Sequence, residues 1–364
     1  MSKTAAFMGM ASLRNLVTDS IAIDLGSAAT IIYVRGSGVV VDEPSLVAVN
    51  NISGEVIAVG LEARQMYGRE ARDVTVVAPL LNGVVADFER TREMLAHFVR
   101  QARSGSSFFS RRALMSVYPG VTHVERRALL TAAEHARIGR VMMMDEGLAA
   151  AFGAGVKLHD VRASAVVDIG SGTTNVAVVG NGAIIHSRSE RIGSADINSA
   201  IINHIRRHRG LAIGAPSAER LKIELASATL PDDLAREITV RGRDVVTGSP
   251  GAITITAGEV YPVANYVVAK IADCVSMTLA ELSPEVAGDI YDRGIVLAGG
   301  GALFDGIAEY MSEYTKLNVK IADEPRYAIV RGLAQMFDEP LLLRRVVRSD
   351  VSPLLDEENE AYSL

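Results

Sequence analysis

The stretch VVDIGSGTTNVAVVGNGAII, residues 166–185, decides which fold the chain can adopt. Its apolar runs on both sides of an Asp-Ile-Gly-Ser bend predict two strands joined by a tight turn, and a second glycine turn leads into a third strand. Glycines at such a bend let backbone N–H groups point at an anion with no Cβ in the way. The stretch is therefore a candidate phosphate hairpin, although one copy alone fits a capped structural turn equally well.

The chain contains nearly the same stretch a second time, as AIDLGSAATIIYVRGSGVVV at residues 22–41. With a displacement of 144 positions, Asp24 falls on Asp168 and Gly26 falls on Gly170. The other matched pairs are Ser27 with Ser171, Thr30 with Thr174, Gly36 with Gly180, and Gly38 with Gly182. Two copies in register predict two similar domains that face each other. Serine and threonine hydroxyls can donate to phosphate oxygens, and an aspartate at each strand end can hold Mg²⁺.

Length and composition limit the class of protein. The 364 residues are enough for two domains, and 49% hydrophobic with 22% charged residues allow a substantial core. A net charge of −6 argues against a general nucleic-acid binder, which would be basic. The single cysteine, Cys274, excludes a disulfide framework and fits a reducing cytoplasm. The sequence contains no run of about 18 uncharged apolar residues, so it predicts no membrane-spanning helix.

A third glycine cluster lies in IVLAGGGALFDGI, residues 295–307. An apolar strand runs into Gly299-Gly300-Gly301, and we expect a helix directly after it, whose N-terminus faces an anion or a sugar. Phe304 stands where the dinucleotide fingerprint needs its third glycine, and the sequence has no P-loop motif. Both of these nucleotide-binding classes are therefore unsupported.

Carboxylates follow another short strand. RVMMMDEG predicts a strand that ends at Asp145-Glu146, and a helix of small residues comes next. A carboxylate there could position water beside a phosphate, or it could only satisfy the dipole of the helix. Both interpretations stay open at this stage.

Two further helices carry charged or ionisable side chains. SAERLKIELA, residues 217–226, predicts a helix with Ser217 as its N-cap, and Glu219 and Lys222 on one face are favoured as a solvated surface pair.

Residues 257–282 predict a long helix that Pro262 interrupts near its start. The i, i+4 histidines at 204 and 208 lie among arginines, so we favour a solvated basic face over a metal pair.

Six motifs in order resemble MreB, the bacterial actin, within the superfamily of actin, Hsp70 and sugar kinases. They are AIDLGSAATIIYVRGSGVVVDEPSLVAV, NGVVADFERTREMLAHFV, MMDEGLAAAFGAG, VVDIGSGTTNVAVV, SAERLK and LAGGGALFDGI. The resemblance covers roughly residues 19–345. It implies an α/β actin-like duplicated ATPase fold, with two domains that each have a mixed sheet and flanking helices, and the nucleotide in the cleft between them.

The resemblance also implies roles for individual positions. The first phosphate loop contains Ser27, Ala28 and Ala29, and the second contains Gly170, Ser171, Gly172 and Thr173. Near the nucleoside lie Glu219, Lys222, Gly299, Gly300, Gly301 and Ala302. Asp24 and Asp168 flank the metal, while Glu146 and Thr173 orient the attacking water. The implied cofactors are ATP, with GTP as a possible substitute, and Mg²⁺.

The expected domains follow the same resemblance. Domain I spans residues 1–160, with a small subdomain at about 51–80, and residues 325–350 complete it. Domain II spans 161–324, with a small subdomain at about 200–255, and 351–364 form an acidic mobile tail. Family members polymerise into paired protofilaments at the inner membrane face and organise cell-wall synthesis, with partners such as MreC and RodZ.

Five residues, at four places in the sequence, depart from the usual pattern of the family. Ala29 replaces an asparagine, Gly147 a proline, Asn175 a glutamate, and Ser194-Ala195 a Gly-Asp pair. Nucleotide binding is still expected, whereas the rate of a slow ATPase is left open. The alternatives are an organelle-aligning or plasmid-segregating actin such as MamK, and a small-molecule kinase of the same fold. An Hsp70-type chaperone is excluded because only about 60 residues follow the third glycine cluster.

Two stretches are candidates for membrane contact. Phe108 and Phe109 lie in SGSSFFSRR, where exposed neighbouring aromatics beside arginines predict a membrane wedge, although one phenylalanine could instead tuck into the domain. Residues 4–13, TAAFMGMASL, are favoured as a membrane-surface helix over a signal sequence. The expected location is therefore the cytoplasmic face of the inner membrane.

Overall fold

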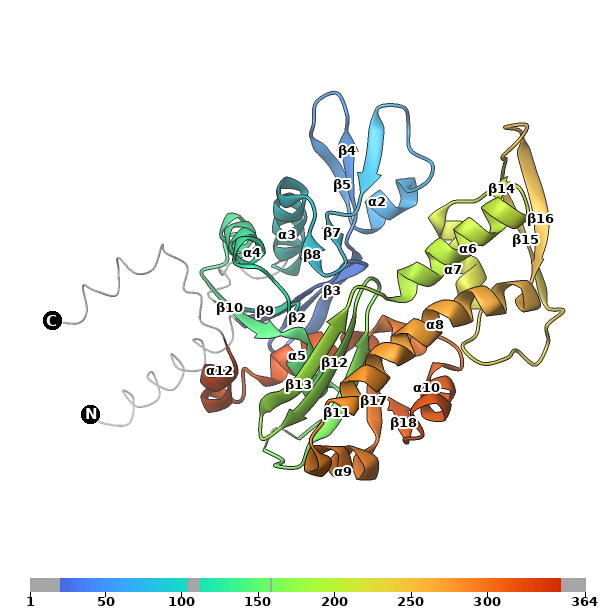
Figure 1. Ribbon diagram of the computed structural model, residues 1–364. Coiled ribbons are helices and arrows are strands. Elements are labelled where there is room, and N and C mark those ends of the chain that lie inside the picture. Colours follow the sequence, from blue (N-terminus) through green and yellow to red (C-terminus); the bar gives the residue numbers. More distant parts are fainter. Residues whose placement is uncertain (1–19, 104–111, 158, 348–364) are drawn as a thin grey trace, which may run out of the picture. The chain divides into compact units, whose positions relative to one another are not determined.

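The computed structural model describes residues 20–103, 112–157 and 159–347 (Figure 1). Phe108, Phe109, the N-terminal stretch 4–13 and the tail 351–364 lie outside these residues. The chain divides into two compact units. The first consists of Met1–Gln65, Asp73–Gly153 and Ile329–Leu364, and the second of Met66–Arg72 and Ala154–Ala328.

The first unit is built on a five-stranded mixed sheet. The strand order is β10-β9-β1-β2-β3. The bounds are β1 Ser20–Leu25, β2 Ala29–Val34, β3 Gly38–Pro44, β9 Arg112–Val117 and β10 Arg140–Asp145. The first three strands form antiparallel pairs, whereas β9 pairs in parallel with both β1 and β10. This sheet contains the predicted first hairpin.

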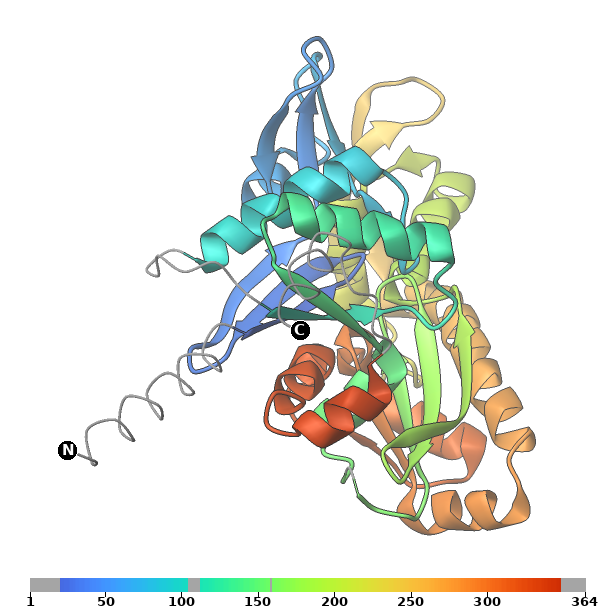
Figure 2. The ribbon, with the colours of Figure 1, turned by 90° about the vertical axis from the view of Figure 1, so that its left-hand side faces the viewer.

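Helices cover both faces of this sheet. Helices α3 (Phe88–Ala102) and α4 (His123–His135) pack side by side over one face, and Figure 2 shows them together. Asp87 caps α3, and Thr122 with Glu125 forms a capping box on α4. The smaller elements are β4 Val47–Asn50, β5 Val56–Val59, α2 Leu61–Met66, β6 Val74–Val77, β7 Leu80–Leu81, β8 Val84–Val85 and α12 Pro340–Val346.

The predicted helix of small residues, α5 (Glu146–Gly153), has a packing reason for its composition. It crosses α11 (Ala328–Gln335) so closely that a Cβ at Gly332 would lie 1.9 Å from the Ala149 carbonyl oxygen. Two helices can pack this closely only where the residues at the crossing have little or no side chain. Every residue of α5 is buried.

The second unit repeats the sheet of the first. Its order is β13-β12-β11-β17-β18, with β11 Ser164–Ile169, β12 Thr174–Gly180, β13 Ala183–Glu190, β17 Ile295–Ala298 and β18 Val319–Ile321. Asp24 pairs with Ile31 in the first hairpin, and Asp168 pairs with Asn175 in the second, so the register repeats with the displacement found in the sequence. The duplication is therefore a duplication of structure.

Among the residues of the second unit that the structure describes, the remaining elements are five α-helices, two 3₁₀ turns and a small sheet in the order β14-β15-β16. The helices are α6 Ser194–His208, α7 Ala215–Leu225, α8 Ala257–Ala280, α9 Pro284–Arg293 and α10 Ile307–Thr315. The others are η1 Gly300–Leu303, η2 Pro325–Tyr327, β14 Leu211–Ala212, β15 Glu237–Asp244 and β16 Pro250–Thr256.

Two helix predictions need correction. Helix α7 begins at Ala215 with Gly214 as its N-cap, so Ser217 is inside the helix, because Pro216 fits the first turn. Helix α8 is continuous through Pro262. The ring removes only one backbone donor, and core packing on either side, by Val260 and Ala264 among others, keeps the helix intact.

Among the described residues, α8 is also the one helix with the length and composition of a membrane span. One side of it is buried in the core of the second unit, against α6, β12 and β13. Packing within the unit therefore accounts for its apolar character.

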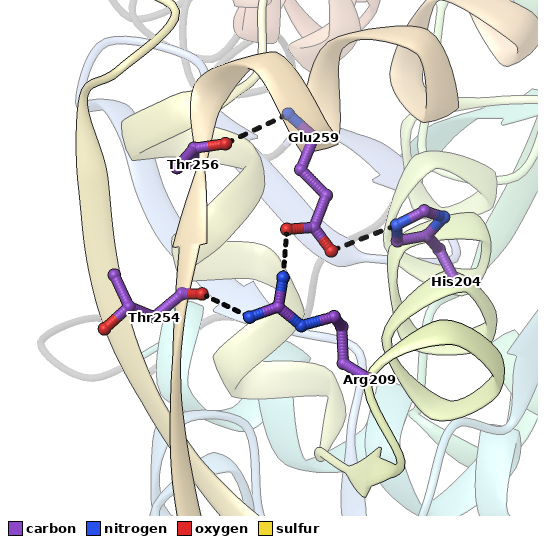
Figure 3. A network of polar contacts seen from close by, with 5 residues as sticks. All are labelled: His204, Arg209, Thr254, Thr256 and Glu259. Atoms are coloured by element: carbon purple, nitrogen blue, oxygen red, sulfur yellow. Dashed lines mark hydrogen bonds and ion pairs between the residues drawn. The ribbon is translucent and has the colours of Figure 1, made fainter.

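The start of α8 is tied to its neighbours by a polar network (Figure 3). Glu259 accepts hydrogen bonds from Arg209 Nη1 (3.1 Å) and pairs with His204 Nε2 (3.2 Å). Arg209 Nη2 also donates to the Thr254 carbonyl oxygen at 3.2 Å, and Glu259 N donates to Thr256 Oγ1. His204 Nε2 is thus paired with the carboxylate of Glu259. The described residues contain no group of three or more possible metal ligands.

Candidate functional site

The predicted first phosphate loop is a tight turn held by Ser45. Gly26 N donates to the Ala29 carbonyl oxygen at 3.1 Å, which closes the turn. Ser45 Oγ donates to the Gly26 carbonyl oxygen at 2.6 Å, and Ser45 N donates to that of Ala28 at 3.1 Å. Ser27 Oγ accepts from Gly83 N at 3.1 Å. These four hydrogen bonds hold the conformation of the loop.

Asp24 lies beside this loop on β1, with a buried carboxyl group. Ser116 Oγ donates to Asp24 Oδ1 at 2.9 Å. Burial raises the pKa of Asp24 to about 6, and the hydrogen bond from Ser116 offsets only part of this shift. A buried carboxylate with this little compensation fits the role of a cation ligand, because Mg²⁺ would stabilise its charge.

The two acidic residues at the end of β10 have different roles. Asp145 Oδ1 accepts from Gly147 N at 2.9 Å and from Leu148 N at 3.3 Å, so Asp145 satisfies the first turn of α5. A proline at 147, the usual residue of the family pattern, could not donate this bond. Glu146 is buried and lines a pocket with Leu25, Ser116 and other residues of the first unit. Of the two interpretations, capping applies to Asp145, whereas Glu146 lies in the wall of this pocket.

The predicted second phosphate loop repeats the turn of the first. Gly170 N donates to the Thr173 carbonyl oxygen at 2.8 Å, at the positions that match Gly26 and Ala29. The start of α6 lies directly behind this loop, because Ser194 N donates to the Gly170 carbonyl oxygen at 3.0 Å. Ala195 N similarly donates to the Ser171 carbonyl oxygen at 2.8 Å. The backbone of α6 therefore supports the loop.

The third glycine cluster lies against Asp168. A Cβ at Gly299, whose φ is +81°, would lie 2.6 Å from Asp168 Oδ1 and 2.4 Å from the Ile169 carbonyl oxygen. A Cβ at Gly301 would lie 2.3 Å from Ile169 Cγ2. The glycines thus allow β17 and η1 to approach the end of β11, where Asp168 is buried. The predicted helix after them is only the single turn η1, since α10 begins at Ile307.

Glu219 and Lys222 are not the solvated surface pair that their spacing favoured. Lys222 is only 8% exposed, and its Nζ donates to Glu219 Oε2 at 2.8 Å and to the Ser194 carbonyl oxygen at 3.4 Å. Asn198 Nδ2 donates to the same Glu219 oxygen at 2.5 Å. Helix α7 is thereby connected to the start of α6, and through it to the second phosphate loop.

The predicted site residues divide between the two units. The first unit contains Asp24, Ser27, Ala28, Ala29 and Glu146. The second contains Asp168, Gly170, Ser171, Gly172, Thr173, Glu219, Lys222, Gly299, Gly300, Gly301 and Ala302. Sequence reasoning missed Ser116 and Asn198, because each acts on a partner that is distant along the chain.

The comparison with known proteins decides the family. The family model described as MreB/Mbl protein matches residues 18–344. The chain belongs to the MreB/Mbl family. It is 41% identical to the cell shape-determining protein MreB of Escherichia coli strain K12, over 88% of this chain and 93% of that protein. It is 39% identical to the cell shape-determining protein Mbl of Bacillus subtilis strain 168, over 87% and 95%.

Solved MreB structures have the same fold. MreB5 of Spiroplasma citri bound to ADP matches with a TM-score of 0.83 at 33% identity, over 90% of this chain and 98% of that one. The AMPPNP-bound form matches with a TM-score of 0.82 at 34% identity, over 88% and 96%. A MamK double helical filament, 20% identical with a TM-score of 0.72 over 88% and 99%, shares the fold. The predicted MreB family and actin-like fold are confirmed, and the MamK-like and kinase alternatives are not favoured.

Proposed function

We propose that this MreB/Mbl chain binds ATP with Mg²⁺ and assembles into filaments that organise cell shape. The observation that carries the proposal is the repeated hairpin, with the same turn, the same register and a buried aspartate in each unit. The nucleotides in the two MreB5 structures, ADP and AMPPNP, support it.

The proposed roles follow from the chemistry of each group. Backbone N–H groups of both loops, with the hydroxyls of Ser27, Ser171 and Thr173, donate to phosphate oxygens. Asp24 and Asp168 are acceptors suited to Mg²⁺, which would neutralise phosphate charge when bound. Glu146 and Thr173 orient water in a slow hydrolysis. ATP is proposed as the nucleotide, with GTP as the competitor to test.

The proposed partners are a second copy of the chain, in paired protofilaments, and the cell-wall elongation machinery with components such as MreC and RodZ. The names of the curated relatives, cell shape-determining proteins, support a role in cell shape. Peripheral location at the inner membrane face is proposed from the sequence, through Phe108 and Phe109.

Sedimentation tests the proposal directly. Purified wild type should pellet with Mg·ATP and stay in the supernatant with EDTA, and electron microscopy should show filaments in the pellet. Asp168→Asn, which removes a metal-side charge, should reduce the pellet strongly. Glu224→Gln, at an exposed carboxylate 3.9 Å from Arg220, is the matched control and should pellet like the wild type. Equal pellets for Asp168→Asn and wild type would overturn the proposed use of the hairpin.

A second arm of the same experiment measures hydrolysis. Glu146→Gln should leave nucleotide binding nearly intact and slow phosphate release by about 10²-fold or more, since water-orienting groups contribute on that order. Unchanged phosphate release in this variant would remove Glu146 from the mechanism.

A further inference from the structure

One end of the five-stranded sheet in the first unit carries four arginines, which we call the arginine cluster. They are Arg103 at the C-cap of α3, Arg112 at the start of β9, Arg137 after α4 and Arg140 at the start of β10. Arg103 is half-buried, and the other three are exposed. The whole chain has a net charge of −6, so this concentration of positive charge is local.

The four arginines lie close together without an acidic counterpart. Arg112 and Arg140 are direct neighbours on the parallel strands β9 and β10. Arg103 Nη2 donates to the carbonyl oxygens of Ala136 at 3.2 Å and Arg137 at 2.8 Å. Burial lowers the pKa of the Arg103 guanidinium group, and the nearby positive charge of Arg137 lowers it further. In the part of the chain that the structure describes, no acidic side chain forms an ion pair with the cluster.

Two of these arginines leave the sheet on the side of the C-terminal helix. Arg112 and Arg140 each precede a residue of the core that α3 and α4 cover, namely Ala113 and Val141. Because side chains alternate along a strand, both arginines extend from the opposite face. Figure 2 shows α12, in red, on that opposite face of the sheet.

The chain enters α12 at the same end of the sheet. Asp338, two residues before α12, pairs with Arg35 at 2.5 Å. Arg35 N donates to the Ser20 carbonyl oxygen at 3.2 Å, and Ser20 is the direct neighbour of Arg112 on β9. Neighbouring strands are about 5 Å apart, so the backbones of Arg35 and Arg112 are separated by about 10 Å.

An acidic segment follows α12 in the sequence. Residues 356–360 read DEENE, with four carboxylates in five positions. They lie outside the described residues, and the family model ends before them, at residue 344. The nine residues from Val347 to this segment can span up to about 30 Å. This reach exceeds the two strand spacings and the length of α12, about 10 Å each.

We infer that the arginine cluster is the docking site of the chain's own acidic segment, residues 356–360. The inference goes beyond the proposed function, because the contact needs neither nucleotide nor a filament. Opposite charge and the short connection favour this segment over an external anion. Arg103 and Arg112 border segment 104–111, which contains the predicted membrane residues, so an occupied cluster offers less positive charge to anionic lipid.

Peptide binding in trans tests the contact with the full-length chain, without nucleotide and at low ionic strength. Fluorescence anisotropy measures the affinity for a labelled peptide of residues 351–364. A neutral-segment variant should bind the peptide, and it carries Asp356→Asn, Glu357→Gln, Glu358→Gln and Glu360→Gln. The wild type should bind about tenfold more weakly or worse, because its own segment competes at an effective concentration in the millimolar range. A peptide with the same four amide replacements should bind neither protein.

Arginine variants of the neutral-segment chain locate the binding site. Arg112→Ala with Arg140→Ala should weaken peptide binding by about tenfold or more. Arg206→Ala with Arg207→Ala is the matched control, because these are adjacent exposed arginines on α6 of the second unit. Thermal unfolding of each variant shows that it is folded.

Equal peptide affinity of the wild type and the neutral-segment variant would overturn the inference, as would equal losses in the two arginine variants. Absence of peptide binding, with flotation on phosphatidylglycerol vesicles that depends on Arg112 and Arg140, would assign the cluster to lipid and also overturn it. None of these measurements uses nucleotide, so their outcome is independent of the proposed ATP site.

Discussion

Asp24, a predicted metal ligand, lies in an environment that disfavours its negative charge. Burial raises the pKa of its carboxyl group to about 6, above the ordinary value of 3.8. Above pH 6 the folded protein therefore carries a charge that its surroundings disfavour, and the unfolded chain does not have this penalty. The penalty is full at neutral pH and disappears as the pH falls below about 4, where the carboxyl group is neutral in both states.

Asp24→Asn should stabilise the protein when nucleotide and Mg²⁺ are absent. At pH 7.5 we expect the free energy of unfolding in EDTA to rise by on the order of 1–3 kcal/mol, because the penalty of the buried charge is removed. Urea unfolding at several pH values measures it, and the advantage of the variant should shrink toward pH 4.5. Adding Mg·ATP should raise the free energy of unfolding less for the variant than for the wild type. A variant less stable than the wild type in EDTA at pH 7.5 would contradict this account.

At the scale of elements, α8 is held at both ends by the same combination of side chains. Glu259 in its first turn contacts His204 and Arg209, and Glu281 at its C-cap contacts His186 and Arg188. The network in Figure 3 also includes the Thr254 carbonyl oxygen of the edge strand β16. The start of α8 is thereby tied to α6 and to the small sheet.

Glu259→Gln should loosen this junction. The variant loses the charge that holds Arg209, and we expect a loss of about 1–2 kcal/mol in the free energy of unfolding, as for a partly buried charged hydrogen bond. Glu224→Gln removes only an exposed i, i+4 pair and should cost about 0.5 kcal/mol or less. Chemical denaturation measures both, and amide exchange should become faster in β16 for Glu259→Gln alone. Equal effects of the two variants would show that the network adds nothing.

At the scale of the whole molecule, assembly should determine membrane binding. One copy with two phenylalanines and two arginines near anionic lipid gains only a few kcal/mol after association costs, so a monomer should bind weakly. A filament repeats the contact along its length, and binding becomes multivalent.

The double substitution Phe108→Ser with Phe109→Ser tests this expectation. We expect filaments of the variant to form in solution with ATP, because the sequence assigns these residues to lipid and not to nucleotide. They should not float with anionic liposomes, whereas wild-type filaments should. If the variant floats as the wild type does, residues 4–13 become the leading candidate for the membrane contact.

The sequence alone determined the hairpins and their duplication. A tight turn needs glycine and short polar residues within a few positions, so its requirements are written locally, and the register of Asp24 and Asp168 follows from the same spacing. The family could be identified for the same reason, because its motifs are local. The actin-like fold followed from the family.

Only the tertiary structure decided which side chains support these motifs. Ser116 donates a hydrogen bond to Asp24, Asn198 donates one to Glu219, and Gly332 allows α5 to pack closely against α11. The partners are far apart in the sequence, so no local pattern predicts these contacts. Burial of Lys222 and the continuity of α8 through Pro262 were mispredicted because local propensity is outweighed by packing against distant elements. Local geometry is set by neighbours along the chain, whereas burial and hydrogen-bond partners depend on where the folded chain returns.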